Sequence, residues 1–100
     1  MNLRNADYGT LSETIKCRKS RIIVYGAGMI GQIVVPYIIE KYGLQNYLDC
    51  YVDADRRKIG KKVLIGFLEY EIKSPDILNH VAQNTLILLT CSRFYDIVQF

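Results

Sequence analysis

The sequence predicts an α/β fold in which a parallel sheet has helices on both faces. Three observations lead to this prediction. Apolar, β-branched runs typical of buried strands alternate with amphipathic or capped segments typical of helices. The segments between the strands are long enough for right-handed crossovers. A glycine-rich turn joins the first of these strands to the helix that follows it.

The composition is that of a single globular domain. The 100 residues are 50% hydrophobic and 23% charged, which is too apolar for disorder. The net charge of +3 is mild and argues against nucleic acid as a partner. Three cysteines without a Cys-x-x-Cys pair argue against disulfides and against a metal site. The first residues lack an apolar signal region, so we expect a cytoplasmic protein.

Residues 1–20 are predicted to form an N-terminal helical arm, and residues 21–100 a domain. Thr10-Leu11-Ser12-Glu13 fits a capping box, which predicts a helix over about residues 11–18. A strand is predicted over 21–25 and a helix over about 29–42, kinked at Pro36. The apolar stripe of this helix, at helical spacing, should face the sheet: Ile30, Ile33, Val34, Tyr37 and Ile38.

Residues 22–39 carry no formal charge, but glycines, Gln32 and Pro36 interrupt the run, so no membrane span is predicted. Val35 and Ile39 lie off the predicted stripe. We expect the N-terminal helix or a second subunit to cover them, so a homodimer is one expectation.

Further strands are predicted over 47–52, near 70–73 and over 85–90. Ser74-Pro75-Asp76 is typical of a helix start, and that helix should end near Asn84. A last helix should begin at Cys91-Ser92 and continue to Phe100. The predicted sheet therefore has about four strands, in the order 3-2-1-4, which makes it a truncated or minimal version of the doubly wound fold.

The run Gly26-Ala27-Gly28-Met29-Ile30-Gly31 fits the Gly-x-Gly-x-x-Gly motif of Rossmann-like nucleotide-binding domains. In that motif the first glycine permits a tight turn, the second lets a diphosphate approach the backbone, and the third lets the helix pack closely on the strand. The helix N-terminus then attracts the phosphates. The alternative is that these glycines only form a tight turn.

Asp53 lies 22 residues beyond Gly31, near the spacing of the acid that accepts hydrogen bonds from ribose hydroxyls. This position favours NAD(H) slightly over NADP(H). The alternative is that Asp53 is a turn residue at the end of a strand.

Arg56 and Arg57 begin a basic stretch, residues 56–62, just past Asp53. Either arginine could meet the 2′-phosphate of NADP(H) or the diphosphate of a nucleotide sugar, although such stretches usually face water. Cys91 and Ser92 follow the last predicted strand at the edge where a ligand phosphate would lie. The alternative for Ser92 is a simple helix cap.

No residue set can be assigned to a reaction. Tyr37 and Lys41 match the Tyr-x-x-x-Lys pair of short-chain dehydrogenases, but they lie on the helix after the glycine-rich loop, where that pair does not belong. His80 is predicted to lie at the surface without a catalytic neighbour.

Four segments resemble small Rossmann-like domains of bacterial polysaccharide and nucleotide-sugar pathways, which occur in sugar dehydratase-related proteins and in some sugar acetyltransferases and methyltransferases. They are residues 22–31, 51–55, 59–62 and 72–78. This resemblance implies NAD(P) or UDP-sugar binding at Gly26, Gly28, Gly31 and Asp53. Arg56-Arg57 replaces the proline common in that group.

Two functions follow as hypotheses. The chain is the cofactor-binding part of an oxidoreductase or sugar-modifying enzyme, or it is a module that binds a nucleotide or UDP-sugar and catalyses nothing alone. The fold cannot separate these hypotheses, since one fold hosts many chemistries.

Overall fold

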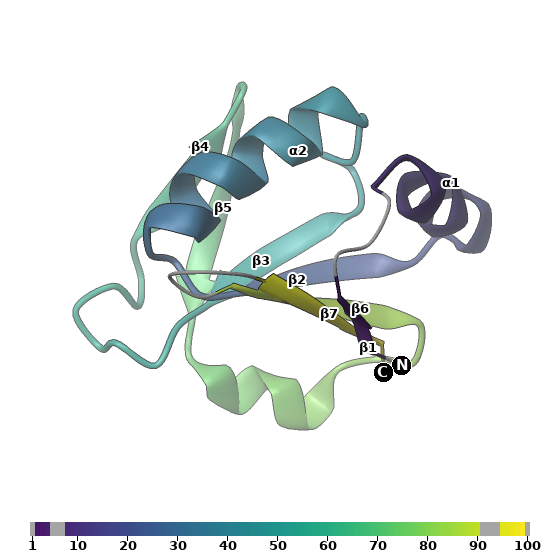
Figure 1. Cartoon of the computed structure of the whole chain (residues 1–100). Helices are drawn as coiled ribbons and strands as arrows, with labels where there is room; N and C mark the ends of the chain where they lie inside the picture. The colour runs from purple at the N-terminus through teal and green to yellow at the C-terminus, as the bar shows by residue number, and fades with distance from the viewer. Residues whose placement is uncertain (1, 5–7, 91–94, 100) are drawn as a thin grey trace.

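The computed structural model describes residues 2–4, 8–90 and 95–99, and it has three layers (Figure 1). A mixed sheet forms the middle layer. Helices α1 (Tyr8–Arg18) and α2 (Val35–Lys41) cover one face, and the 3₁₀ helix η2 (Pro75–His80) covers part of the other. The protein is therefore an α/β protein with helices on both faces of its sheet.

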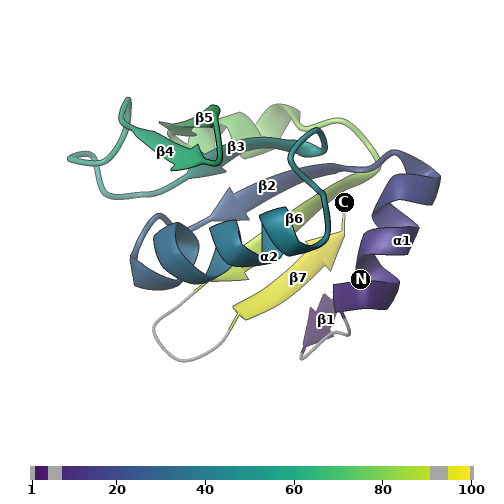
Figure 2. The ribbon, with the colours of Figure 1, turned by 90° about the horizontal axis from the view of Figure 1, so that it is seen from above.

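The described residues form seven strands, which follow each other in the sheet in the order β1-β7-β6-β2-β3-β5-β4 (Figure 2). Four of them are parallel neighbours: β6 (Thr85–Thr90), β2 (Arg21–Tyr25), β3 (Leu48–Val52) and β5 (Leu68–Lys73). The other three are antiparallel to their neighbours: β1 (Asn2–Arg4), β7 (Tyr95–Gln99) and β4 (Lys62–Ile65).

The strand number and the order of the whole sheet differ from the prediction because these three antiparallel strands extend it. The helix predicted from residue 91 to 100 is wrong over Tyr95–Gln99, which forms β7 and pairs with β6. The five residues of β7 are too few for periodicity to separate strand from helix, and pairing with the free edge of β6 decides the structure. Strand β1 was not predicted for the same reason.

Helix α1 begins at Tyr8, so Thr10 lies in its first turn, and the predicted capping box is wrong. The start of η2 is confirmed, because Ser74 precedes it and its side chain accepts a hydrogen bond from the Asp76 amide at 3.3 Å. That helix ends at His80, short of the predicted Asn84. Asn84 instead adopts a positive φ of 68° and holds the end of α1, with its side-chain amide donating to the Arg18 carbonyl at 2.8 Å.

The apolar stripe predicted after the glycine-rich loop is confirmed at Ile38, which is buried, and wrong at Ile33, Val34 and Tyr37, which are exposed. Ile33 and Tyr37 are 66% and 65% exposed, whereas Val35 and Ile39 are buried against the sheet. A π-helical turn, η1 (Ile30–Val34), precedes α2 and breaks the 3.6-residue period on which the prediction rested. It ends two residues before Pro36, which has no N–H to donate within the helix.

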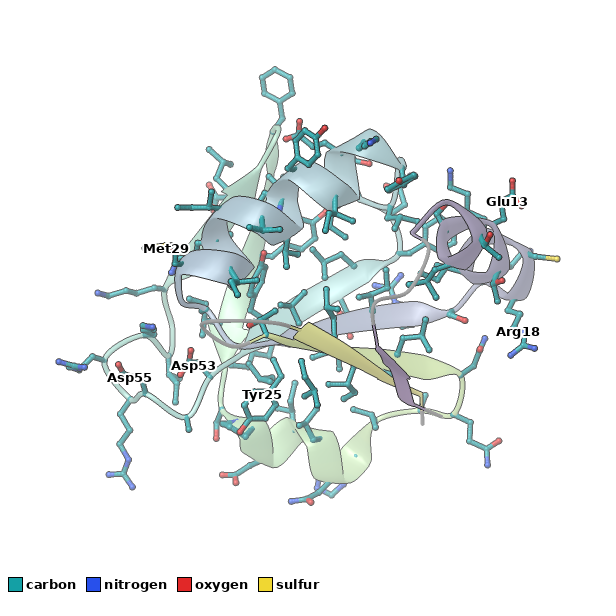
Figure 3. The ribbon with its side chains drawn as sticks, viewed as in Figure 1. Glu13, Arg18, Tyr25, Met29, Asp53 and Asp55 are labelled. Atoms are coloured by element: carbon teal, nitrogen blue, oxygen red, sulfur yellow. The ribbon has the colours of Figure 1, made fainter. Side chains whose placement is uncertain are left out.

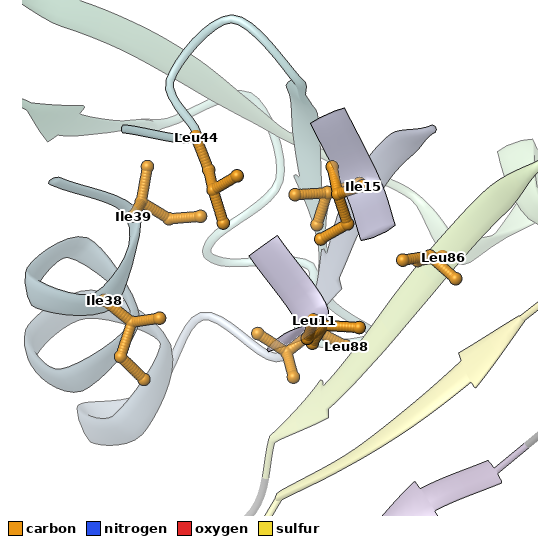
Figure 4. A pocket seen from close by; sticks show the side chains of 8 residues that line it. Leu11, Ile15, Ile38, Ile39, Leu44, Leu86 and Leu88 are labelled. Carbon is orange, nitrogen blue, oxygen red and sulfur yellow. The ribbon is translucent and has the colours of Figure 1, made fainter. Parts of the chain in front are cut away.

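The larger core lies between the sheet and the two α-helices. Ile15 of α1 and Ile39 of α2 meet strand residues such as Ile22 and Leu88 there. A small apolar cavity of about 30 Å³ remains between the helices and the sheet (Figure 4). The smaller core, on the other face, packs η2 against Ile23, Val52 and Ile87. Within the described ranges, no helix has the length and hydropathy needed to cross a membrane.

Candidate functional site

The turn after β2 requires glycine at its first position. Gly26 has a φ of 114°, a conformation that residues with a side chain rarely adopt. A Cβ there would also collide with the side-chain oxygen of Thr90, at the end of β6. The Thr90 hydroxyl lies 3.0 Å from the Tyr25 carbonyl and 3.2 Å from that of Gly26, and it fastens the turn to β6.

Gly31 brings the helix close to the turn. A Cβ on Gly31 would collide with the carbonyl oxygen of Gly26, so only glycine permits this approach. The Tyr51 hydroxyl, buried in the core, donates to the Gly31 carbonyl at 2.6 Å and fixes the first helical turn over β3. Burial raises the pKa of this phenol, which therefore stays protonated as a donor.

Gly28 faces open space, because no other atom lies within 4 Å of the position that its Cβ would take. Among the described residues, no acceptor is found for the amides of Gly28 and Met29. The carbonyl of Gly28 accepts from the Gln32 amide at 2.9 Å, so the loop is ordered by its own helix. This part of the loop is where a ligand can approach the backbone.

Asp53 comes directly after β3 and lies against the loop. Its Oδ2 accepts from the Ala27 amide at 2.8 Å, and its Oδ1 accepts from the Asp55 amide at 2.8 Å. The Lys58 ammonium is 3.8 Å from Oδ2. The amide of Gly26 is also occupied, by the Val52 carbonyl at 2.8 Å. The loop amides that remain for a phosphate are therefore those of Gly28 and Met29.

A hollow of about 370 Å³ lies over the loop at the carboxyl ends of the parallel strands. Figure 3 shows Met29 and Asp53 at this end of the sheet, from the first helical turn and from the loop after β3. Its lining combines an open backbone, one carboxylate, one ammonium, one hydroxyl and two apolar side chains: Gly26, Gly28, Met29, Ile30, Asp53, Lys58 and Thr90.

The two arginines predicted for the site do not line the hollow. Arg57 turns to Asp55 instead, with its Nε and Nη2 atoms 3.0 and 2.9 Å from the two carboxylate oxygens. These hydrogen bonds lower the pKa of Asp55 to about 2. Arg56 is exposed. Cys91 and Ser92 lie outside the described residues.

Lys58 and Thr90 line the hollow but were not singled out in the sequence. Lys58 belongs to the predicted basic stretch, yet spacing alone does not say which of its cations turns inward. Its place is set by two turns, in which its amide donates to the Asp55 carbonyl and its carbonyl accepts from Lys61, at 3.0 and 3.1 Å. Thr90 directly precedes Cys91, which was predicted to lie at the site. Its position at the end of a predicted strand could therefore have identified Thr90 as a lining residue.

The remaining candidates stand apart from the hollow. Tyr37 and Lys41 are neighbours on α2, with the Lys41 ammonium 5.8 Å from the Tyr37 ring centre, but both are exposed. His80 is exposed on η2. Within the part of the chain that the structure describes, no group of metal-ligating side chains is found.

The chain has no significant match among protein-family models, curated proteins or solved structures.

Proposed function

We propose that the hollow over Gly26–Gly31 binds the ribose and diphosphate of a nucleotide, with NAD(H) the first candidate and NADP(H) the second. One observation carries this proposal: the backbone at Gly28 and Met29 is open, its amides have no acceptor among the described residues, and it faces a hollow that contains a carboxylate and an ammonium. Main-chain amides beside a helix start are a common binding site for phosphate.

Asp53 is compatible with a ribose even though it already has partners. A carboxylate offers about four acceptor positions. The Ala27 amide uses one position on Oδ2, and the Asp55 amide uses one position on Oδ1. The remaining positions can accept from the ribose hydroxyls, while the bond to Ala27 keeps the carboxylate in place. A 2′-phosphate at the same point would meet this negative charge, which is why NAD(H) is preferred.

Lys58 is the proposed cation for the diphosphate. It is the basic side chain that lines the hollow, and its side chain is 34% exposed, so a ligand can reach it. A bound phosphate would compete with Asp53 for the ammonium. We propose this role for Lys58 in place of Arg56 and Arg57.

The activity proposed with this binding is that of the cofactor domain of an oxidoreductase or a sugar-modifying enzyme. A second candidate is a binding module for a nucleotide or UDP-sugar that catalyses nothing alone. One observation supports this binding module. Among the described side chains that line the hollow, Asp53 and Lys58 are the ones that could act as acid or base, and they pair with each other.

Thermal unfolding with NAD⁺, NADP⁺, UDP-glucose and coenzyme A tests the proposal. A ligand at a hundred times its Kd adds about 2.7 kcal/mol to folding, which raises the Tm of a 100-residue domain by roughly 10 °C or more. We expect NAD⁺ to give the largest shift. A protein whose Tm none of these ligands raises does not have the proposed function.

Two variants locate the binding. Gly28→Glu places a negative side chain in the open space and should abolish the ligand-induced shift without changing the Tm of the free protein. Lys58→Ala should lower affinity and weaken its dependence on salt. The matched control is Arg57→Ala, which removes a cation of the same stretch that points to Asp55 and should leave binding unchanged.

A further inference from the structure

The exposed apolar side chains of this protein are gathered in two short stretches. Among the described residues, the large hydrophobic side chains that are exposed all lie in 29–37 or 64–68. Phe67, at the tip of the β4–β5 hairpin, is the extreme case, with its side chain as exposed as in an open chain. Scattered single residues of this kind are ordinary on a monomer, but a concentration of them indicates an interaction surface.

The two stretches adjoin. Strands β4 and β5 rise beside α2 on the same side of the sheet (Figure 1), and α2 packs against β4. The Glu40 side chain reaches the hairpin tip, where its Oε1 is 3.7 Å from the position that a Cβ on Gly66 would take. Tyr37 lies one helical turn before Glu40. We call the surface that results the α2–hairpin face, formed by Ile33, Val34, Tyr37, Phe67 and Leu68.

We propose that the α2–hairpin face binds the same face of a second copy of this chain, giving a two-fold dimer. Its size supports this. At ordinary side-chain areas these five residues expose on the order of 600 Å², the upper end for a monomer's largest patch, and with a polar rim they approach the ~800 Å² that each partner contributes to a stable interface. Two of the five are aromatic, the type enriched in interfaces.

The charges around the face favour a copy of the chain over an anionic partner. Glu40 and Lys41 lie next to each other on the exposed side of α2, one acidic and one basic, whereas the Lys62–Glu69 pair lies with Leu64 on the opposite side of the hairpin. Both signs are thus present in equal number. A two-fold axis can place each charge near the opposite charge of the partner, whereas a lipid headgroup or nucleic-acid surface requires an excess of positive charge.

This dimer differs from the one expected from the sequence. Val35 and Ile39, the residues that suggested self-association, are buried within the chain itself. Sequence periodicity places Ile33 and Tyr37 inward, so the true outer face of α2 is visible only in the folded protein.

Sedimentation equilibrium of the 100-residue chain, from low micromolar to near-millimolar concentration, tests the proposal. We expect the wild type to reach twice the mass of one chain. Phe67→Glu and Tyr37→Glu should each raise the dissociation constant by about tenfold or more, the effect of losing one central interface residue. Both side chains are exposed, so the circular dichroism spectrum and the Tm of the dilute protein should not change.

Ala82→Glu is the matched control, because it introduces the same charge at an exposed position in the loop after η2. It should leave the dimer intact. A wild-type chain that stays monomeric at every concentration would overturn the proposal, as would a dimer that survives both substitutions. A monomer that instead sediments with vesicles of phosphatidylglycerol would also overturn it, since the face would then cover lipid.

Discussion

The carboxylate of Asp53 accepts a hydrogen bond from the amide of Ala27, with 2.8 Å between Oδ2 and the nitrogen. This bond joins the end of β3 to the glycine-rich loop after β2, two points that are 26 residues apart in the chain. The same carboxylate holds the start of the loop after β3 through the Asp55 amide. Asp53 therefore shapes both walls of the hollow, whatever ligand the hollow binds.

Replacing Asp53 should loosen this end of the sheet. Asp53→Ala leaves two amides without their acceptor, and each such loss costs about 1–3 kcal/mol. We expect the free energy of unfolding in urea to fall by roughly 2–6 kcal/mol on that basis. Asp53→Asn keeps one acceptor oxygen and should lose about half as much. Equal losses for the two variants would show that the hydrogen bonds do not account for the effect.

Gly26 and Thr90 should be energetically coupled. Gly26→Ala combines a positive φ with a collision against the Thr90 side chain, so it should cost on the order of 2–4 kcal/mol. Thr90→Ala removes the colliding oxygen but not the strained φ. In a double-mutant cycle, Gly26→Ala should therefore cost about 1 kcal/mol less in the Thr90→Ala background. Strict additivity would contradict the contact.

Truncating Ile39 should destabilise the protein much more than truncating Ile33. Ile39 is 2% exposed and lines the cavity between the helices and the sheet, so Ile39→Ala should cost about 2–5 kcal/mol. Ile33 is 66% exposed, and Ile33→Ala should change stability by no more than about 0.5 kcal/mol. Urea unfolding of both variants at a concentration where the chain is monomeric measures the difference. The reverse ranking would favour the stripe predicted from the sequence.

Stability should fall in alkaline solution because of Cys50. Burial, followed by the nearby charge of Asp49, raises the pKa of this thiol from 9.0 to about 11. The unfolded chain therefore loses the proton first, and stability that is fully present below pH 9 is lost as the pH rises towards 11. One such group gives a slope of up to about 1.4 kcal/mol per pH unit.

Cys50→Ala separates this effect from other titrations. The variant loses some stability at neutral pH from its smaller side chain, but its free energy of unfolding should fall less steeply between pH 9 and 10 than that of the wild type. As the pH approaches and passes 10, Tyr51 and Tyr70 add a decline of the same sign in both proteins, because burial raises the pKa of both phenols above 10.0. A wild type and a variant with parallel pH profiles would contradict the assignment to Cys50.

The strand, turn and helix around Gly26 could be predicted from the sequence alone. These features depend on local chemistry: a β-branched run favours a strand, and glycine is favoured where φ is positive and needed where two backbone segments touch. The same holds for the cap at Ser74. The sequence also placed Asp53 at the end of a strand that neighbours β2, and the fold brings its carboxylate to the loop.

Contacts between distant parts of the chain determine which face of α2 is buried, which cation turns towards the hollow and how the sheet ends. The contact between Gly31 and Gly26 sets the rotation of the helix, and the π-helical turn shifts its period, so Val35 and Ile39 replace Ile33 and Tyr37 in the core. Lys58 reaches Asp53, whereas Arg57 pairs with Asp55. Strand β7 forms because the edge of β6 offers it hydrogen bonds. Each outcome depends on residues far apart in the chain or on competition between neighbours, which local patterns do not record.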